Sequence, residues 1–290
     1  MGSAGFARRD GLPTEVEVLR LEERLGPPHD DRLTIPTRAA FHSVLLIDDG
    51  VSAHHVDFEP WAIGPRHLLV IPDGHVQWFD PARVISGSLV LFTSAFLERC
   101  HVGMRGLIEA TRAPFRRGAN VRLSERSASV VREGVAVVAS HASFEPSDPY
   151  AQEIAASTLS LLLFKIASLT EMRDLFSGQR EDELVTRFLE LLDDQFRSNR
   201  TASTYARALG VAPRTLDRHL VASCGQTTRQ AISARVVLEA RRLLTDPNEQ
   251  IQTVAYRLGF SEPQNFTRFI RTQTGRSPQG LRASTTGQLR

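Results

Sequence analysis

Residues 204–227, TYARALGVAPRTLDRHLVASCGQT, recur in altered form as residues 253–277, TVAYRLGFSEPQNFTRFIRTQTGRS. The first halves of the two copies align at an offset of 49 residues and the second halves at an offset of 50. The matched positions are Ala206, Leu209, Gly210 and Val211 with Ala255, Leu258, Gly259 and Phe260, then Leu216, Arg218, Leu220 and Gly225 with Phe266, Arg268, Ile270 and Gly275.

Each copy has the pattern of a short helix, a glycine turn and a second helix. Gly210 and Gly259 suit the left-handed conformation that ends a helix. Pro213 suits a first helical turn, and Ser261 is placed to cap the helix that follows it. We therefore predict two helix-turn-helix units, with the extra residue of the second copy absorbed in the turn before its last helix.

The second helix of each copy has an apolar side and a polar side. Two apolar residues spaced four apart are predicted to face inward in each helix, Leu216 with Leu220 and Phe266 with Ile270. Arg, Gln and Asn remain outside, and these side chains make paired hydrogen bonds to base edges in the major groove of DNA. The predicted DNA contacts are Arg214, Thr215, Asp217 and Arg218 in the first copy, and Pro263, Gln264, Asn265, Thr267, Arg268 and Arg271 in the second.

Residues 228–244, between the copies, are predicted to form one helix. Its inward positions are expected to be Val236, Ala240, Leu243 and Leu244. A single helix that carries both units fixes their separation, which is about 34 Å if they enter successive major grooves on one face of DNA. One chain is then expected to read an asymmetric site across two grooves.

The repeat lies in the basic part of the chain. Residues 199–290 contain 14 Arg, no Lys and 5 acidic residues, a net charge of +9, whereas residues 1–198 carry −7. A basic region attached to an acidic body is typical of a module that binds a polyanion. Charge alone also fits a basic face exposed to solvent, but in combination with the two repeated units it favours DNA.

Residues 184–284 resemble the AraC/XylS family of bacterial regulators. The motifs that carry the resemblance are Tyr205-Ala206, Leu209-Gly210-Val211, Arg235 with EARRLL (239–244), Val254-Ala255, Gly259-Phe260, Asn265-Phe266-Thr267-Arg268 and Gly275-Arg276-Ser277-Pro278. This sequence departs from the family pattern at Ala212, where a Ser or Thr cap is usual, at Ile270, where Phe is common, and at Leu281, which replaces an aromatic residue.

The resemblance implies a transcription regulator in the bacterial cytoplasm, without enzymatic activity or a cofactor, whose outer helix faces approach double-stranded promoter DNA. It also implies activation as the commoner mode of action and RNA polymerase as a partner. Two alternatives are a metal-dependent cupin enzyme with a DNA-binding tail and an architectural DNA-binding protein. The second reads mainly the DNA backbone, which Gln264, Asn265 and Arg268 argue against.

Residues 38–148 have the pattern of a β domain. Five short apolar runs, separated by turn signals such as Asp49-Gly50, predict an antiparallel sandwich or barrel. The runs are 41–47, 54–58, 66–71, 76–80 and 87–92. Residues 128–144 are expected either to complete the sheet or to pack as a helix. Ahead of this domain, residues 13–25 have helical spacing within an N-terminal arm of residues 1–37.

Residues 41–97 also resemble the cupin-like β-barrel regulatory domains that precede such DNA-binding regions. The markers are Phe41-His42, Asp49-Gly50, Val56-Asp57-Phe58, Pro72-Asp73-Gly74, VQWF (76–79) and Val90-Leu91-Phe92. The resemblance implies a barrel whose interior binds a small effector, in an α+β multidomain protein. An effector-independent regulator, in which this domain only dimerises or binds a protein partner, is the alternative.

Five of the nine histidines lie between residues 42 and 75. Adjacent His54 and His55 point to opposite faces of a strand, and Gln77 occupies the place of the later His of cupin metal sites, so we predict no metal site. Two interpretations stay open: a pocket for a small molecule, or side chains that complete the core and rim. The candidate effector-binding residues are His42, His54, Trp61, His75 and Trp78.

A helix is predicted over residues 150–175, and its middle, LSLLLFKI (159–166), is apolar almost all round. We expect the β domain to cover one side and a second subunit of a homodimer to cover the other, with residues 149–180 serving as helix and linker. The DNA-binding domain then spans 181–290 and opens with a helix over 181–196. The apolar run is far shorter than the roughly 20 residues of a membrane span. Two cysteines, Cys100 and Cys224, indicate no disulfide framework.

Overall fold

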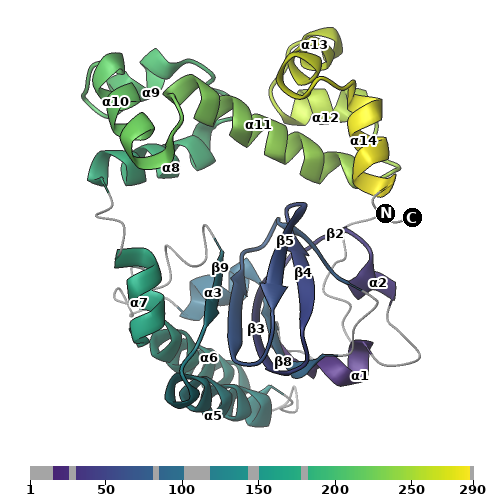
Figure 1. The fold of residues 1–290 in the computed structure, drawn as a ribbon, viewed down its shortest axis with the longest axis vertical. Coiled ribbons are helices and arrows are strands. Elements are labelled where there is room, and N and C mark those ends of the chain that lie inside the picture. Colours follow the sequence, from purple (N-terminus) through teal and green to yellow (C-terminus); the bar gives the residue numbers. More distant parts are fainter. Residues whose placement is uncertain are drawn as a thin grey trace. The chain divides into compact units, whose positions relative to one another are not determined.

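The structure is a computed structural model that describes residues 16–25, 31–80, 85–100, 118–142, 150–177 and 182–287. The chain divides into two compact units, one within Ser3–Gly178 and the other within Gln179–Arg290. The first is the β unit and the second the helical unit (Figure 1). In the described ranges, no helix is long and apolar enough to cross a membrane.

The β unit contains two antiparallel sheets, ordered β1-β8-β3-β6-β9 and β2-β7-β4-β5. The strands are β1 (Val16–Arg20), β2 (Thr37–Arg38), β3 (His42–Asp49), β4 (Ser52–Val56), β5 (Glu59–Ile63), β6 (His67–Ile71), β7 (Val76–Phe79), β8 (Ser86–Phe92) and β9 (Ala119–Arg122). No described strand pair joins the sheets, so the expected closed barrel is corrected to two open sheets. The short strands β2 and β9 lie at sheet edges, where they end the hydrogen-bond ladder.

Two apolar cores lie on opposite faces of the five-stranded sheet. Along β3, Leu45 and Ile47 belong to the core shared with the four-stranded sheet. Val44 and Leu46 alternate with them and pack toward the helices α5 (Glu125–His141) and α6 (Ala151–Ser168). Figure 1 shows both helices against that sheet. The smaller helices of this unit are α1 (Leu21–Leu25), α2 (Asp31–Thr34), α3 (Ser94–Cys100) and α7 (Thr170–Ser177).

The structure decides the secondary structure of two segments of the β unit. Residues 16–20, expected to be helical, form β1 because they pair along β8, with Val16 opposite Phe92. Part of the expected N-terminal arm therefore belongs to the sheet. For the stretch expected either to complete the sheet or to pack as a helix, the second alternative holds: residues 125–141 form a helix capped by the Ser124 side chain. Its buried residues, Ala128, Val131, Gly134, Val135 and Val138, have helical spacing.

The helix expected over 150–175 is divided at Leu169, whose backbone is extended with φ −61° and ψ 139°. The following helix, α7, returns to the start of α5 through Glu171. Its carboxylate accepts hydrogen bonds from the Ser124 backbone N–H at 2.8 Å and the Ser127 hydroxyl at 2.9 Å. Burial alone would raise the pKa of Glu171, but these hydrogen bonds outweigh it and lower the pKa to about 2.

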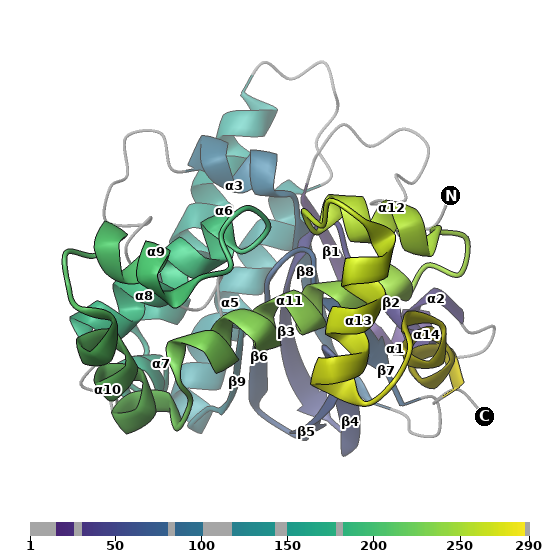
Figure 2. The same cartoon turned by 90° about the horizontal axis from the view of Figure 1, so that it is seen from above.

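The helical unit consists of α8 (Glu183–Gln195), α9 (Ala202–Ala208), α10 (Pro213–Cys224), α11 (Thr228–Leu244), α12 (Ile251–Arg257), α13 (Pro263–Thr274) and α14 (Pro278–Gly287). One continuous core runs through all of it. Figures 1 and 2 show α11 running from the α9–α10 pair to the α12–α13 pair. The residues predicted to face inward on α10, α11 and α13 are buried, as expected: Leu216, Leu220, Val236, Ala240, Leu243, Leu244, Phe266 and Ile270.

Candidate nucleic-acid interface

The helical unit contains two helix-turn-helix heads with the same backbone design. The first head is α9 with α10, and the second is α12 with α13. Gly210 and Gly259 end the first helix of each head with φ of 72° and 78°, as the sequence predicts. Both second helices have Pro in the first turn. Ser261 does not cap α13, because the extra residue moves the N-cap to Glu262, whose side chain makes no capping hydrogen bond.

The outer face of α10 presents two exposed arginines, Arg214 and Arg218, with Thr215 half-buried between them. Asp217, another predicted DNA contact, makes a hydrogen bond within the helical unit. Its carboxylate accepts a hydrogen bond of 2.8 Å from the backbone N–H of Thr228, the first residue of α11. A carboxylate at a helix N-terminus stabilises the unpaired N–H groups there. Asp217 therefore joins α10 to α11.

The outer face of α13 presents Gln264, Arg268 and Arg271 exposed, with Pro263, Asn265 and Thr267 half-buried. The guanidinium of Arg268 donates a hydrogen bond of 2.9 Å to the Asn265 side-chain oxygen. The Thr267 hydroxyl donates back to the Pro263 carbonyl at 3.0 Å. A shallow hollow lies along this face, lined by Pro263, Gln264, Thr267, Arg268, Arg271 and Thr272. Thr272 was not among the residues predicted from sequence. It follows Arg268 by four residues, a spacing that places both on the same face of a helix.

A buried ion cluster, also missed from sequence, lies where α8 and α11 meet. The Glu239 carboxylate is 1% exposed. It lies 3.1 Å from Arg235, 3.3 Å from Arg197 and 3.6 Å from Arg242. Arg235 also donates a hydrogen bond of 2.7 Å to Asp193 on α8. A buried carboxylate requires such partners, because leaving it unpaired costs several kcal/mol.

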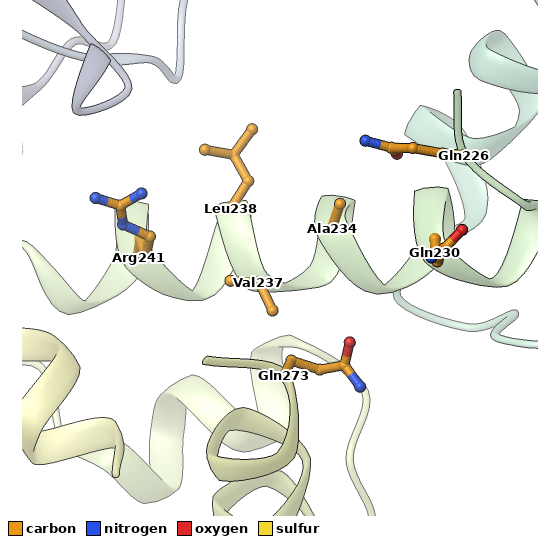
Figure 3. Close-up of a pocket in the computed structure, with 7 residues that line it drawn as sticks. All are labelled: Gln226, Gln230, Ala234, Val237, Leu238, Arg241 and Gln273. Atoms are coloured by element: carbon orange, nitrogen blue, oxygen red, sulfur yellow. The ribbon is translucent and has the colours of Figure 1, made fainter. Parts of the chain in front are cut away.

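The opposite side of α11 is open. A groove of about 400 Å³ runs along it between the heads and is lined by Gln226, Gln230, Ala234, Val237, Leu238, Arg241 and Gln273 (Figure 3). In Figure 3, Leu238 and Arg241 project from α11 on the side away from Gln273 of α13. Arg235 and Glu239, whose ion pairs connect α11 to α8 and the segment after it, do not line this groove.

Two of the candidate effector residues face the space between the sheets. His54 and Trp61 are opposite each other in the β4–β5 register and share that face. The ring of His54 donates a hydrogen bond of 3.1 Å to the Gln77 side-chain oxygen, and the Gln77 amide donates one of 3.1 Å to the Ser43 hydroxyl. A polar chain thus crosses the core from one sheet to the other.

His54 is 1% exposed, and its Nδ1 has no hydrogen-bond partner among the described residues. Burial lowers the pKa of His54 to about 4, so the imidazole is neutral near pH 7. Because Gln77 accepts from Nε2, Nδ1 holds the free lone pair. His54 therefore presents an unused acceptor inside the β unit.

The other three candidates lie elsewhere, so the structure does not bring the five together. His42 stacks on Phe92 at 5.2 Å, on the helix side of the five-stranded sheet. Trp78 is paired in register with His55, stacks on it at 4.4 Å, and lies on the opposite face of the four-stranded sheet from His54. His75 precedes β7, and its Nε2 lies 3.5 Å from the Asp57 carboxylate. The described residues contain no group of three potential metal ligands.

Comparison with known proteins finds a family model that matches part of the chain and relatives that align along most of it. The model, a helix-turn-helix domain, matches residues 205–284. The HTH-type transcriptional activator RhaS of Citrobacter koseri is 22% identical over 281 residues, covering 97% of this chain and 95% of the relative.

One similar solved structure is that of ToxT from Vibrio cholerae bound to (E)-4-(8-methylnaphthalen-1-yl)but-3-enoic acid. It is 14% identical in sequence, the match covers 93% of this chain and 98% of that one, and the TM-score is 0.42. An AraC-type transcriptional regulator from Chromobacterium violaceum is 21% identical, covers 38% of this chain and 96% of that one, and has a TM-score of 0.33. The repeated heads and the matched model show that residues 205–284 form a helix-turn-helix domain, and the chain, with its N-terminal β-rich domain, is similar along most of its length to DNA-binding transcription regulators of the AraC type.

Proposed function

We propose that this chain is a cytoplasmic transcription activator whose two heads read two successive major grooves of promoter DNA. The observation that carries the proposal is the pair of equivalent exposed arginines, Arg218 on α10 and Arg268 on α13, on heads that share one core. Arginine is the side chain most often found in specific contact with guanine. The basic charge of this part of the chain adds attraction to phosphates along the site.

The two faces differ in the chemistry that they offer to bases. In the first head, Arg214 and Arg218 are free of described ion pairs, whereas Asp217 is occupied at the start of α11. In the second, the guanidinium of Arg268 is hydrogen-bonded to the Asn265 side chain. This bond orients Arg268 and reduces its side-chain conformational freedom. We therefore assign base contacts to Arg214, Arg218, Gln264 and Arg268, and a supporting role to Asn265.

The test is selection of bound fragments from random-sequence DNA by the full-length protein, followed by footprinting on the selected site. We expect two unlike sequence elements, with centres about one helical turn apart on one face of the duplex. A single element, or equal affinity for selected and random DNA, would contradict two-groove reading.

We further propose that a small effector binds between the sheets, near His54 and Trp61. The free acceptor of His54 supports a ligand with a hydrogen-bond donor, because a buried polar atom without a partner is costly. Metabolite screening by thermal shift should find a ligand that stabilises the wild type and fails to stabilise His54→Leu. If ligand binding survives this substitution, the site lies elsewhere; if no compound binds, an effector-independent β unit is favoured.

We propose that the protein forms a homodimer through α5 and α6, with RNA polymerase as its partner at the promoter. Leu161 on α6 and Val137 on α5 are large apolar side chains that are 50% and 39% exposed. A contiguous apolar patch on a protein surface marks a site of contact with another protein. Leu161→Glu should convert a dimer to a monomer in sedimentation experiments, and a wild type that sediments as a monomer would refute this interface.

A further inference from the structure

The segment of residues 196–200, which follows α8, is fixed to the first head. The Tyr205 hydroxyl on α9 donates a hydrogen bond of 2.9 Å to the Asn199 carbonyl. Tyr205 is fully buried and packs edge-on against Phe188 of α8, with ring centroids 5.4 Å apart. The segment therefore moves with α8 and α9.

The same segment contacts the second head at its glycine turn. The Arg200 guanidinium lies 3.5 Å from the centroid of the Phe260 ring and donates a hydrogen bond to the Leu258 carbonyl. The carbonyl of Arg197 approaches Gly259 so closely that a Cβ there would lie 2.0 Å from the oxygen. The turn of the second head thus packs directly on the backbone of a segment that belongs to the first.

The buried ion cluster ties this segment to α11 as well. Arg197 pairs with Glu239, and the guanidinium groups of Arg197 and Arg235 lie 4.6 Å and 4.1 Å from the centroid of the Phe196 ring. None of these residues lines the groove of Figure 3. The heads are therefore joined at two places, through α11 and through residues 196–200.

We propose that Arg200, in a segment that the Arg197–Glu239 ion pair ties to α11, is a positioning residue that sets the distance and rotation between the two reading helices, and so determines which half-site spacing the protein accepts. This inference rests on two-groove reading. Two linked binding modules gain affinity only when their geometry allows simultaneous engagement. A rigid second connection restricts that gain to one spacing, whereas α11 alone would leave the second head freer to adjust.

The experiment measures the affinity of the full-length protein for its selected site and for the same site with one base pair added or removed between the elements. We expect the wild type to bind the altered spacings about tenfold or more weakly, and Arg200→Ala to reduce this ratio to about threefold. Arg207→Ala is the matched control, since it removes an exposed arginine of the same unit that is outside the contact. It should lower affinity for all spacings alike and preserve the ratio.

Three results separate the possibilities. An Arg200→Ala protein that folds and keeps the wild-type ratio would overturn the inference. A wild type indifferent to spacing would instead contradict two-groove reading itself. If Arg200→Ala melts at a markedly lower temperature, Arg200→Met is measured in its place, because it keeps an unbranched chain over Phe260 and loses the hydrogen bond to Leu258. A wild-type ratio in a folded Arg200→Met would also overturn the inference.

Discussion

The two heads have the same backbone conformation but differ in the residues that surround their turns. A Cβ at Gly210 would meet no atom within 4 Å, whereas at Gly259 it would lie 2.0 Å from the carbonyl oxygen of Arg197. Glycine at the first turn is required for its left-handed φ alone, and at the second turn for φ and for space. A repeated motif therefore specifies the same local conformation twice without specifying the same packing.

The largest expected difference between the heads is in stability at these glycines. Gly210→Ala should lower the free energy of unfolding by about 1–2 kcal/mol, the cost of a left-handed L-residue. Gly259→Ala adds a clash with backbone and should cost about 2–5 kcal/mol in total. Chemical denaturation of the two variants measures both. Equal losses would mean that residues 196–200 move away from the second turn without cost.

The arginines are expected to produce the next largest effect, in binding. Arg218→Ala and Arg268→Ala should each weaken specific DNA binding by about 1–3 kcal/mol and relax the preference at one base position. Asn265→Ala should act on the same base position as Arg268→Ala, since the two side chains are hydrogen-bonded. The measurement is affinity for the selected site and for random DNA. An equal loss of affinity for the selected site and for random DNA would show that these arginines contact phosphates instead of bases.

A smaller effect is expected at the equivalent positions Asp217 and Thr267. Asp217→Ala removes a hydrogen bond to the start of α11 and should lower stability by about 1 kcal/mol. Thr267→Ala removes only a bond back to the preceding turn of its own helix and should change stability by a few tenths. Thermal melts of both variants test this. Altered base preference in Asp217→Ala at unchanged melting temperature would place Asp217 against DNA instead.

The smallest effect is expected at His219, which pairs with Asp182, the N-cap of α8. The equivalent residue of the second head is Phe269, which packs against the core. Because both partners of the first-head pair are partly exposed, His219→Phe should change stability by less than about 1 kcal/mol. A loss well above this would show that the pair anchors α10 to α8, and Asp182→Asn would then separate the cap from the contact with His219.

The sequence predicted the heads well because their signals are local. Glycine turns, Pro213 and apolar residues spaced four apart determine each helix-turn-helix within a few residues. The contacts between the heads were not predicted, because Arg197 and Glu239 are 42 residues apart and Arg200 and Leu258 are 58 apart. No local pattern marks such pairs.

Less of the β unit could be predicted from the sequence, for a similar reason. Residues 16–20 have an ambiguous period, and their pairing with β8 decides for a strand. Alternation along β4 correctly separates His54 from His55, but only the register with β7 shows that Trp78 accompanies His55. The candidate effector residues were therefore grouped by closeness in sequence, while the strand faces separate them.

The open surroundings of Gly210 bear on how such regulators diverge. A side chain at Gly210 itself would meet no distant part of the chain, whereas one at Gly259 would also have to suit residues 196–200. We expect lineages descended from one ancestral protein to acquire new operators mainly by drift in the first head, with the second kept as the conserved half of an inherited site.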